Sequence, residues 1–337
     1  MDVSIIIPVY QRQGELEALL NSLSGSVPKS FEVETLIVED GSPVADKPKL
    51  QEQYGRIGAR FILNERNMGP AYSRNRGAKE ATGRYFWFID SDVIADRPDT
   101  LGALIAALEE DPKRLATGGV IEQVNGTEYF MQPKLLPAFH YLYEKVPPSE
   151  DYDEVVDFLS TANFFISKRN FLTAGGFDPN LNIAEDNEFC VRLQRVIGGN
   201  FHQSARTFVL HDISDRGRDT GTLGYSSDRR AYIHVKFKAR NLLLRRHLPW
   251  RLVFLPFLEA VSLIVYYMGI KADRWHLARV DKAKTDAAVI TRVQEYLLLF
   301  FYMIVGMGLL FTPASHGKRM NGQLSNGPGG PDHRDAA

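Results

Sequence analysis

The sequence predicts an α/β protein with a doubly wound, largely parallel sheet, and three observations support this fold class. Short apolar runs alternate with segments of helical character four times within residues 1–92. The run from Tyr85 to Ile89 contains only large apolar and aromatic residues, as expected of a strand buried on both faces. Acidic residues follow several of the predicted strands, at the edge where open α/β sheets bind their ligands.

The composition is that of an ordinary globular protein with a sizeable core. The chain has 337 residues, of which 44% are hydrophobic and 24% charged. Its formal net charge of -1 argues against a general nucleic-acid binder. The single cysteine, Cys190, cannot form an intramolecular disulfide, so we expect a reducing, cytoplasmic setting. The N-terminus lacks the pattern of a signal peptide, and export is not expected.

Strand and helix alternate through the N-terminal part. The predicted strands are short β-branched or aromatic runs bounded by turn residues, at 3–9, 31–38, 60–63 and 85–89. The intervening segments favour helix, at 14–20, 48–54 and 71–82, with Gly83 as a natural stop. This alternation is the pattern of consecutive βα units.

The following residues continue the same architecture less regularly. We expect helices at 99–108 and 187–196, and strands at 115–124, 158–166 and 201–210. The segment 127–157 is irregular, aromatic and proline-bearing, and is interpreted either as an acceptor-side flap or as a plain surface excursion.

A change of character near Arg216 separates a first domain, 1–215, from a basic and apolar helical region, 216–320. Its two most apolar segments, 252–270 and 296–311, are poor spanning helices: the first carries Pro256 and Glu259, and the second is short. The basic connection between them also conflicts with the positive-inside rule. We expect peripheral or re-entrant attachment to an anionic membrane surface; integral spanning and a self-associating helical bundle are the alternatives. Residues 321–337 are expected to be a disordered tail.

Acidic residues and one histidine stand at predicted strand ends or at a helix start: Asp40, Asp90 with Asp92, Asp186, and His211. A single acid in a turn is ordinary, but independent turn acids have no reason to recur at the ligand-facing edge of one sheet. The carboxylates of Asp90 and Asp92 would repel each other, and a hard divalent cation relieves such repulsion. We therefore expect a metal site that holds an anionic ligand.

Five motifs in order resemble the family 2 glycosyltransferases of GT-A fold over residues 1–215. They are Ser4-Ile5-Ile6-Ile7-Pro8-Val9-Tyr10, Glu39-Asp40-Gly41-Ser42, Asn67-Met68-Gly69 with Ser73-Arg74-Asn75-Arg76-Gly77, the DXD motif Asp90-Ser91-Asp92, and Glu185-Asp186. The resemblance implies a mixed, mostly parallel sheet flanked by helices. It also implies an enzyme of class EC 2.4 that transfers a sugar from a nucleotide-sugar donor with inversion at the anomeric carbon.

The resemblance assigns the donor site to residues at the ends of the first strands. Pro8 and Tyr10 would border the nucleotide, and Asp40 would accept a hydrogen bond from the base, usually uracil. The residues that would lie beside the donor are Asn67, Gly69 and Arg74.

The remaining acids receive separate roles by the same resemblance. Asp90 would contact the ribose or sugar, and Asp92, with His211, would ligate Mg²⁺ or Mn²⁺. Asp186 would be the base that takes the proton of the acceptor hydroxyl. Glu185 would support its position or contact the acceptor. The alternative is that Glu185 and Asp186 only cap the following helix.

The leading interpretation is a metal-dependent inverting enzyme at the cytoplasmic face of the cell membrane. It would add one sugar, most simply from a UDP-sugar, to a lipid-linked or polysaccharide-precursor hydroxyl. Two alternatives stay open: a degenerate family member acting as a membrane-bound interaction protein, and a sugar-phosphate nucleotidylyltransferase. The second would need a glycine-rich phosphate loop, which residues 9–14 do not offer. Processive polymerisation is disfavoured because residues 271–275 lack the glutamine of the Gln-x-x-Arg-Trp motif.

Overall fold

The computed structural model describes residues 1–43, 47–56, 58–95, 97–123, 130–135, 141–146, 152–181, 184–211 and 246–247. The predicted tail and, apart from residues 246 and 247, the predicted membrane-associated region lie outside the described residues. Within the described ranges, no helix is both long and apolar enough to cross a membrane.

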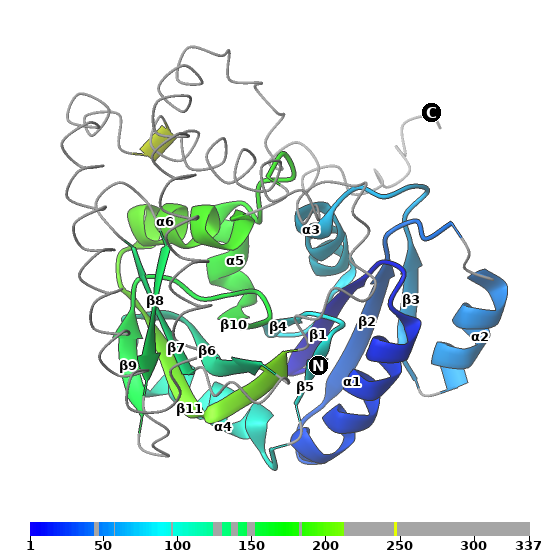
Figure 1. Cartoon of the computed structure of the whole chain (residues 1–337), viewed down its shortest axis with the longest axis horizontal. Helices are drawn as coiled ribbons and strands as arrows, with labels where there is room; N and C mark the ends of the chain where they lie inside the picture. The colour runs from blue at the N-terminus through cyan, green and yellow to red at the C-terminus, as the bar shows by residue number, and fades with distance from the viewer. Residues whose placement is uncertain are drawn as a thin grey trace, which may run out of the picture.

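The fold is built on one nine-stranded mixed sheet (Figure 1). Its N-terminal half is parallel and has the order β3-β2-β1-β4. These strands are β1 (Val3–Val9), β2 (Val33–Glu39), β3 (Arg60–Leu63) and β4 (Tyr85–Ile89). All four strands lie close to the positions that the sequence predicts, and every residue of β4 is buried, as expected of a central strand.

The other half of the sheet mixes the two directions. Its strands are β5 (Val93–Ile94), β6 (Arg114–Gln123), β9 (Asp153–Val156), β10 (Asn163–Ser167) and β11 (Asn200–His211). β10 runs antiparallel between β4 and β6, β11 is parallel to β6, and β5 and β9 pair antiparallel with β11. The expectation of a mostly parallel sheet therefore holds only for the N-terminal half.

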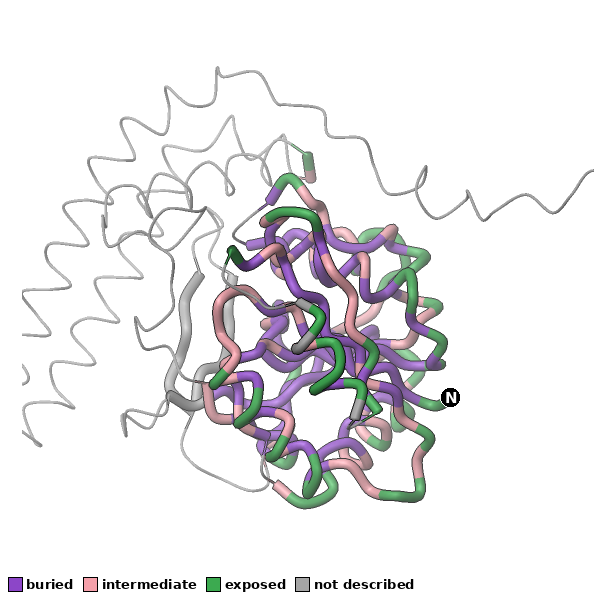
Figure 2. Tube along the Cα trace, turned by 90° about the vertical axis from the view of Figure 1, so that its right-hand side faces the viewer, coloured by how far each residue is buried: buried purple, intermediate pink, exposed green. Residues whose placement is uncertain are grey.

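Helices cover both faces of the sheet (Figure 1). One face packs against α1 (Gln13–Ser26), α2 (Lys47–Arg56) and α4 (Thr100–Glu110). The other packs against α3 (Pro70–Glu80), α5 (Lys168–Ala174) and α6 (Glu185–Ile197). Alternate side chains of β4 enter the two cores: Trp87 lies in the first and Phe88 in the second. Figure 2 shows the buried residues in the interior of this layered arrangement.

The segment 127–157 contains strands that the sequence analysis did not predict. β7 (Phe130–Leu135) and β8 (Tyr141–Val146) form an antiparallel pair, and β9 adds to the main sheet. The expectation of an irregular segment is therefore wrong for these residues. Pro133 in β7 breaks the usual strand composition, and the pairing depends on backbone hydrogen bonds rather than on an apolar run.

Candidate active site

The strand directions bring the predicted site residues to one edge of the sheet. β1, β2, β4 and β11 all point their carboxyl ends the same way, because β10 reverses direction between β4 and β6. Tyr10, Asp40 and Asp90 follow the first three of these strands, and His211 ends the fourth. Residues from distant parts of the chain therefore share the ligand-facing edge.

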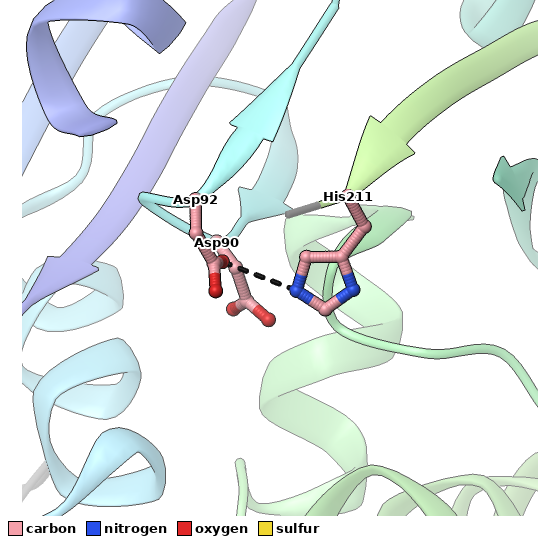
Figure 3. Close-up of side chains that lie close together, drawn as sticks. All are labelled: Asp90, Asp92 and His211. Carbon is pink, nitrogen blue, oxygen red and sulfur yellow. Dashed lines mark hydrogen bonds and ion pairs between the residues drawn. The ribbon is translucent and has the colours of Figure 1, made fainter. Parts of the chain in front are cut away.

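Asp90, Asp92 and His211 form a cluster of metal-ligating side chains. One ligand atom from each lies within 4.8 Å of the others, and Figure 3 shows the two carboxylates and the imidazole directed toward one another. The His211 Nε2 atom is 3.2 Å from Asp92 Oδ1. Two carboxylates and one imidazole suit a divalent cation such as Mn²⁺ or Mg²⁺. The cluster therefore fits the predicted metal site, and it adds Asp90 to the two expected ligands.

Arg12 is a site residue that the sequence analysis did not identify. Its Nη1 atom makes a close ion pair with Asp92 Oδ2, and the two side chains are only 12% and 10% exposed. Burial by itself would raise the pKa of Asp92, but the His211 hydrogen bond and the Arg12 charge lower it. In the sequence Arg12 is only a basic residue three positions after the end of β1. Its pairing with Asp92 could be expected only once β1 and β4 were known to be neighbouring strands.

Arg74 links Asp90, after β4, to Glu185 of α6. It donates from Nη2 to Asp90 Oδ1 at 2.6 Å and from Nη1 to Glu185 Oε1 at 2.7 Å. The guanidinium is 3% exposed, and although burial opposes its charge, Asp90 and Glu185 raise the pKa of Arg74. In this arrangement Arg74 fixes the positions of both carboxylates.

Asp40 organises the loop between β3 and α3. Its Oδ1 accepts hydrogen bonds from Asn64 Nδ2 at 2.7 Å and from the Met68 amide at 2.9 Å, and its Oδ2 accepts one from the Gly69 amide at 2.8 Å. Asn67 Oδ1 also faces the Gly69 amide, at 3.2 Å. Asp40 is 4% exposed, and this burial raises its pKa. The predicted donor residues Asp40, Asn67 and Gly69 thus form one hydrogen-bonded unit.

Pro8 and Tyr10 lie beside this unit. Pro8 is opposite Val38 in the parallel pairing of β1 and β2, and both Pro8 and Tyr10 keep part of their surface exposed. Their place at the end of β1 is the one that the resemblance assigns to the nucleotide-binding side.

Asp186 lies in the first turn of α6. Its Oδ1 accepts hydrogen bonds from the backbone amide and Nδ2 of Asn187, at 2.8 and 3.0 Å. Burial and the Glu185 charge raise the pKa of Asp186 to about 7, and Asp90 adds to this effect. Among the described residues, Asp186 Oδ2 accepts no hydrogen bond, which leaves this oxygen for a proton.

The structure distinguishes the two neighbouring acids of α6. Glu185 points toward Arg74 and is buried, whereas among the described parts of the chain the hydrogen bonds of Asp186 come from the adjacent Asn187. The helix cap is Ala184, with no side-chain hydrogen bond. Of the two roles considered for Glu185, its buried ion pair favours positioning over contact with an acceptor.

Comparison with known proteins agrees with this fold and indicates the family. Residues 4–169 match the model of glycosyl transferase family 2. The chain is 29% identical over 197 residues to an uncharacterized glycosyltransferase of Haemophilus influenzae, an alignment that covers 57% of this chain and 61% of that protein. It is 25% identical over 225 residues to the glucosyl-dolichyl phosphate glucuronosyltransferase of Haloferax volcanii, covering 63% of this chain and 70% of that protein.

The fold is also similar to that of a solved glycosyltransferase structure. A crystal structure of GalNAc-T7 with UDP, GalNAc and Mn²⁺ superposes with a TM-score of 0.55 at 18% identity, covering 70% of this chain and 47% of that one. The chain therefore spans less than two thirds of the length of this protein and of the Haemophilus relative. The family match and the related sequences identify residues 4–169 as a glycosyltransferase region of family 2, and the structural similarity shows that its fold is of the GT-A type.

Proposed function

We propose that this protein is an inverting, metal-dependent glycosyltransferase that moves one sugar from a UDP-sugar to an acceptor hydroxyl. The observation that carries the proposal is the arrangement of two separate acidic groups at one sheet edge. Asp90, Asp92 and His211 form a cluster suited to a cation, and Asp186 lies close enough to Asp90 for its pKa to respond. The UDP and Mn²⁺ in the GalNAc-T7 structure support this choice of donor and metal.

The donor would lie along the carboxyl ends of β1, β2 and β4. Pro8 and Tyr10 would border the nucleotide, and the Asp40 unit would shape the base pocket. Asp90, Asp92 and His211 would hold Mn²⁺ or Mg²⁺. When bound, such a cation neutralises the negative charge that develops on the departing diphosphate.

Asp186 would act on the acceptor. Its Oδ2 would take the proton of the acceptor hydroxyl as the hydroxyl oxygen forms a bond to the anomeric carbon. The bond from that carbon to the diphosphate oxygen would break, and its electron pair would leave with the diphosphate. Attack from the face opposite the leaving group inverts the anomeric configuration. A base with a pKa of about 7 suits this task, because it is largely deprotonated at slightly alkaline pH and still holds a proton well.

The acceptor is proposed to be a lipid-linked or polysaccharide-precursor hydroxyl at the cytoplasmic membrane face. The Haloferax relative supports this proposal, since its name specifies glucosyl-dolichyl phosphate, a lipid-linked sugar. The basic and apolar composition of residues 216–320 supports binding to an anionic surface. Sedimentation of the full chain with vesicles tests this part: we expect binding to vesicles that contain anionic lipid and little binding to neutral ones. Equal absence from both would contradict the membrane proposal.

A donor screen tests the enzymatic proposal directly. UDP-, GDP- and TDP-sugars are compared by thermal shift with Mn²⁺ and with EDTA, and transfer to candidate acceptors is followed by mass spectrometry. We expect stabilisation by one UDP-sugar that depends on Mn²⁺, and a product whose anomeric configuration is inverted by NMR. Donor binding without transfer to any acceptor and without donor hydrolysis would favour the degenerate interaction protein. Release of pyrophosphate from a sugar phosphate and a nucleoside triphosphate would favour the nucleotidylyltransferase.

A further inference from the structure

Arg246 and His247 lie against α6, far from it in sequence. Arg246 Nη1 makes a close ion pair with Asp178 Oδ2, and His247 Nε2 is 2.9 Å from Glu188 Oε1. Arg195 Nη1 also donates to the His247 carbonyl oxygen at 2.9 Å. We call this set of contacts the 246–247 clasp. It joins the chain beyond the last strand of the sheet to α6 and to the segment between α5 and α6.

The buried part of the clasp is the contact between His247 and Glu188. The side chains of His247 and Glu188 are 10% and 2% exposed. Glu188 also accepts hydrogen bonds from Arg192, at 2.9 Å from Nε and 2.6 Å from Nη2. Burial opposes the charge of Glu188, but His247 and Arg192 lower its pKa to about 2. A buried carboxylate is costly unless it is paired, so loss of His247 would leave Glu188 with fewer of the partners that stabilise its charge.

The clasp contacts α6 within one helical turn of Asp186, the candidate base. Glu188 lies three residues after Glu185 on α6, so the two side chains stand about one helix turn apart. Glu185 is bound to Arg74, which is bound to Asp90. The start of α6 is thus fixed toward the donor site by Arg74 and toward the C-terminal chain by the clasp, with Asp186 between these two attachments.

Two residues between α5 and α6, Phe177 and Asp178, are also held by contacts from elsewhere in the chain. Asn75 of α3 bonds both backbone groups of Phe177, accepting from its amide at 2.9 Å and donating to its carbonyl at 2.8 Å. Asp178 follows immediately and receives Arg246. Arg246 therefore adds a second attachment next to the one that Asn75 makes at Phe177.

We propose that the 246–247 clasp positions Asp186 for sugar transfer, so that the chain beyond the catalytic sheet controls the transfer step without forming the donor site. The proposal rests on the proposed function. None of the clasp residues belongs to the Asp40 unit or to the metal-ligand cluster. A displacement of a catalytic group by about 1 Å costs on the order of a hundredfold in rate. Loss of the clasp should therefore lower kcat while the donor KM stays nearly constant.

A charge exchange tests the ion pair of the clasp. Asp178→Arg and Arg246→Asp are made singly and together in the full chain, with Arg206→Asp, an exposed arginine on β11, as the control for the charge change. Each single variant should lower kcat about tenfold with the donor KM within about twofold, and the double variant should recover to within about threefold of the wild type. The control should match the wild type.

His247 provides a second pair of variants. His247→Ala removes the contact with Glu188 and should lower kcat about tenfold, whereas His247→Gln retains a side-chain donor and should stay within about threefold. Hydrogen exchange of the first turn of α6 should accelerate in His247→Ala and in both single charge variants, and thermal melting checks that each variant is folded.

Three results would overturn the clasp proposal: unchanged kcat in the single charge variants, a double variant no better than either single one, or a donor KM that rises in proportion to the loss of kcat. Unchanged hydrogen exchange of α6 in all three disruptive variants would contradict it whatever the activity. Absence of transfer by the wild-type protein would instead contradict the proposed function. The two proposals can therefore fail separately.

Discussion

Asp186→Asn should make the protein more stable and almost inactive. The folded protein raises the pKa of Asp186 from 3.8 to about 7, which corresponds to at most about 4 kcal/mol against the charged form. Because the folded state binds this proton more tightly than the unfolded state, stability falls as pH rises from about 4 to 7. Asparagine retains an oxygen for the two Asn187 donors and carries no charge. We therefore expect the variant to gain about 1–3 kcal/mol at pH 8.

The same substitution, Asp186→Asn, should remove the general base and with it most of the activity. Asparagine cannot take the acceptor proton, and a general base contributes about 10²–10⁴-fold to the rate, so kcat should fall by at least about a hundredfold. In the wild type, kcat should fall about tenfold per pH unit below about pH 7, where Asp186 becomes protonated.

Three measurements check this prediction together: urea unfolding at pH 5 and 8, calorimetry of UDP with Mn²⁺, and transfer rates across pH 5 to 9. UDP affinity should stay within about twofold, since Asp186 is not among the donor residues. Glu154→Gln, at an exposed acid on β9, is the control for loss of a carboxylate charge. A variant with lower stability at pH 8, or with transfer within about threefold of wild type, would refute the assignment of Asp186 as a half-buried base with a raised pKa.

Three further variants test other parts of the molecule. Asp92→Ala should weaken Mn²⁺-dependent UDP binding about 10–100-fold by calorimetry, and unchanged affinity would remove Asp92 from the metal site. Arg12→Gln removes the cation paired with Asp92, so Mn²⁺ alone should bind about tenfold tighter by electron paramagnetic resonance; equal or weaker binding would contradict the ion pair. Glu34 is bonded to Ser4, Thr82 and Arg60, and these bonds lower its pKa from 4.5 to about 2 although burial opposes this. The ionised Glu34 side chain therefore stabilises the fold above about pH 4.5, and this stabilisation is lost as pH falls toward 2. Glu34→Gln should lower the free energy of unfolding in urea by about 1–3 kcal/mol at pH 7 and by almost nothing at pH 2. A difference between variant and wild type that is the same at both pH values would refute this.

Much of the fold could be predicted because the N-terminal strands are apolar on both faces. β1 and β4 carry runs such as Ile5-Ile6-Ile7 and Phe86-Trp87-Phe88, whose composition indicates a central strand without further information. β7 and β8 had no such signal, since both strands mix apolar with charged or polar residues and β7 also contains a proline. The reversal of β10 was also hidden, because strand direction leaves no mark in composition.

The sequence alone determined which residues can do chemistry at the sheet edge. Asp40, Asp90 and Asp92 follow strands whose apolar composition fixes where they end, and parallel βα units place such ends together. Asp186 at a predicted helix start and His211 at a predicted strand end were candidates for the same reason, and the family resemblance supplied the expected role of each residue.

Only the tertiary structure decided how these residues are connected. It paired Arg12 with Asp92, linked Arg74 to both Asp90 and Glu185, and brought His247 to Glu188, a residue 59 positions away. Such pairings depend on strand order and helix packing, which bring together charges that are remote in sequence. The elevated pKa of Asp186 has the same origin, because burial and the Glu185 and Asp90 charges act on it only in the folded chain.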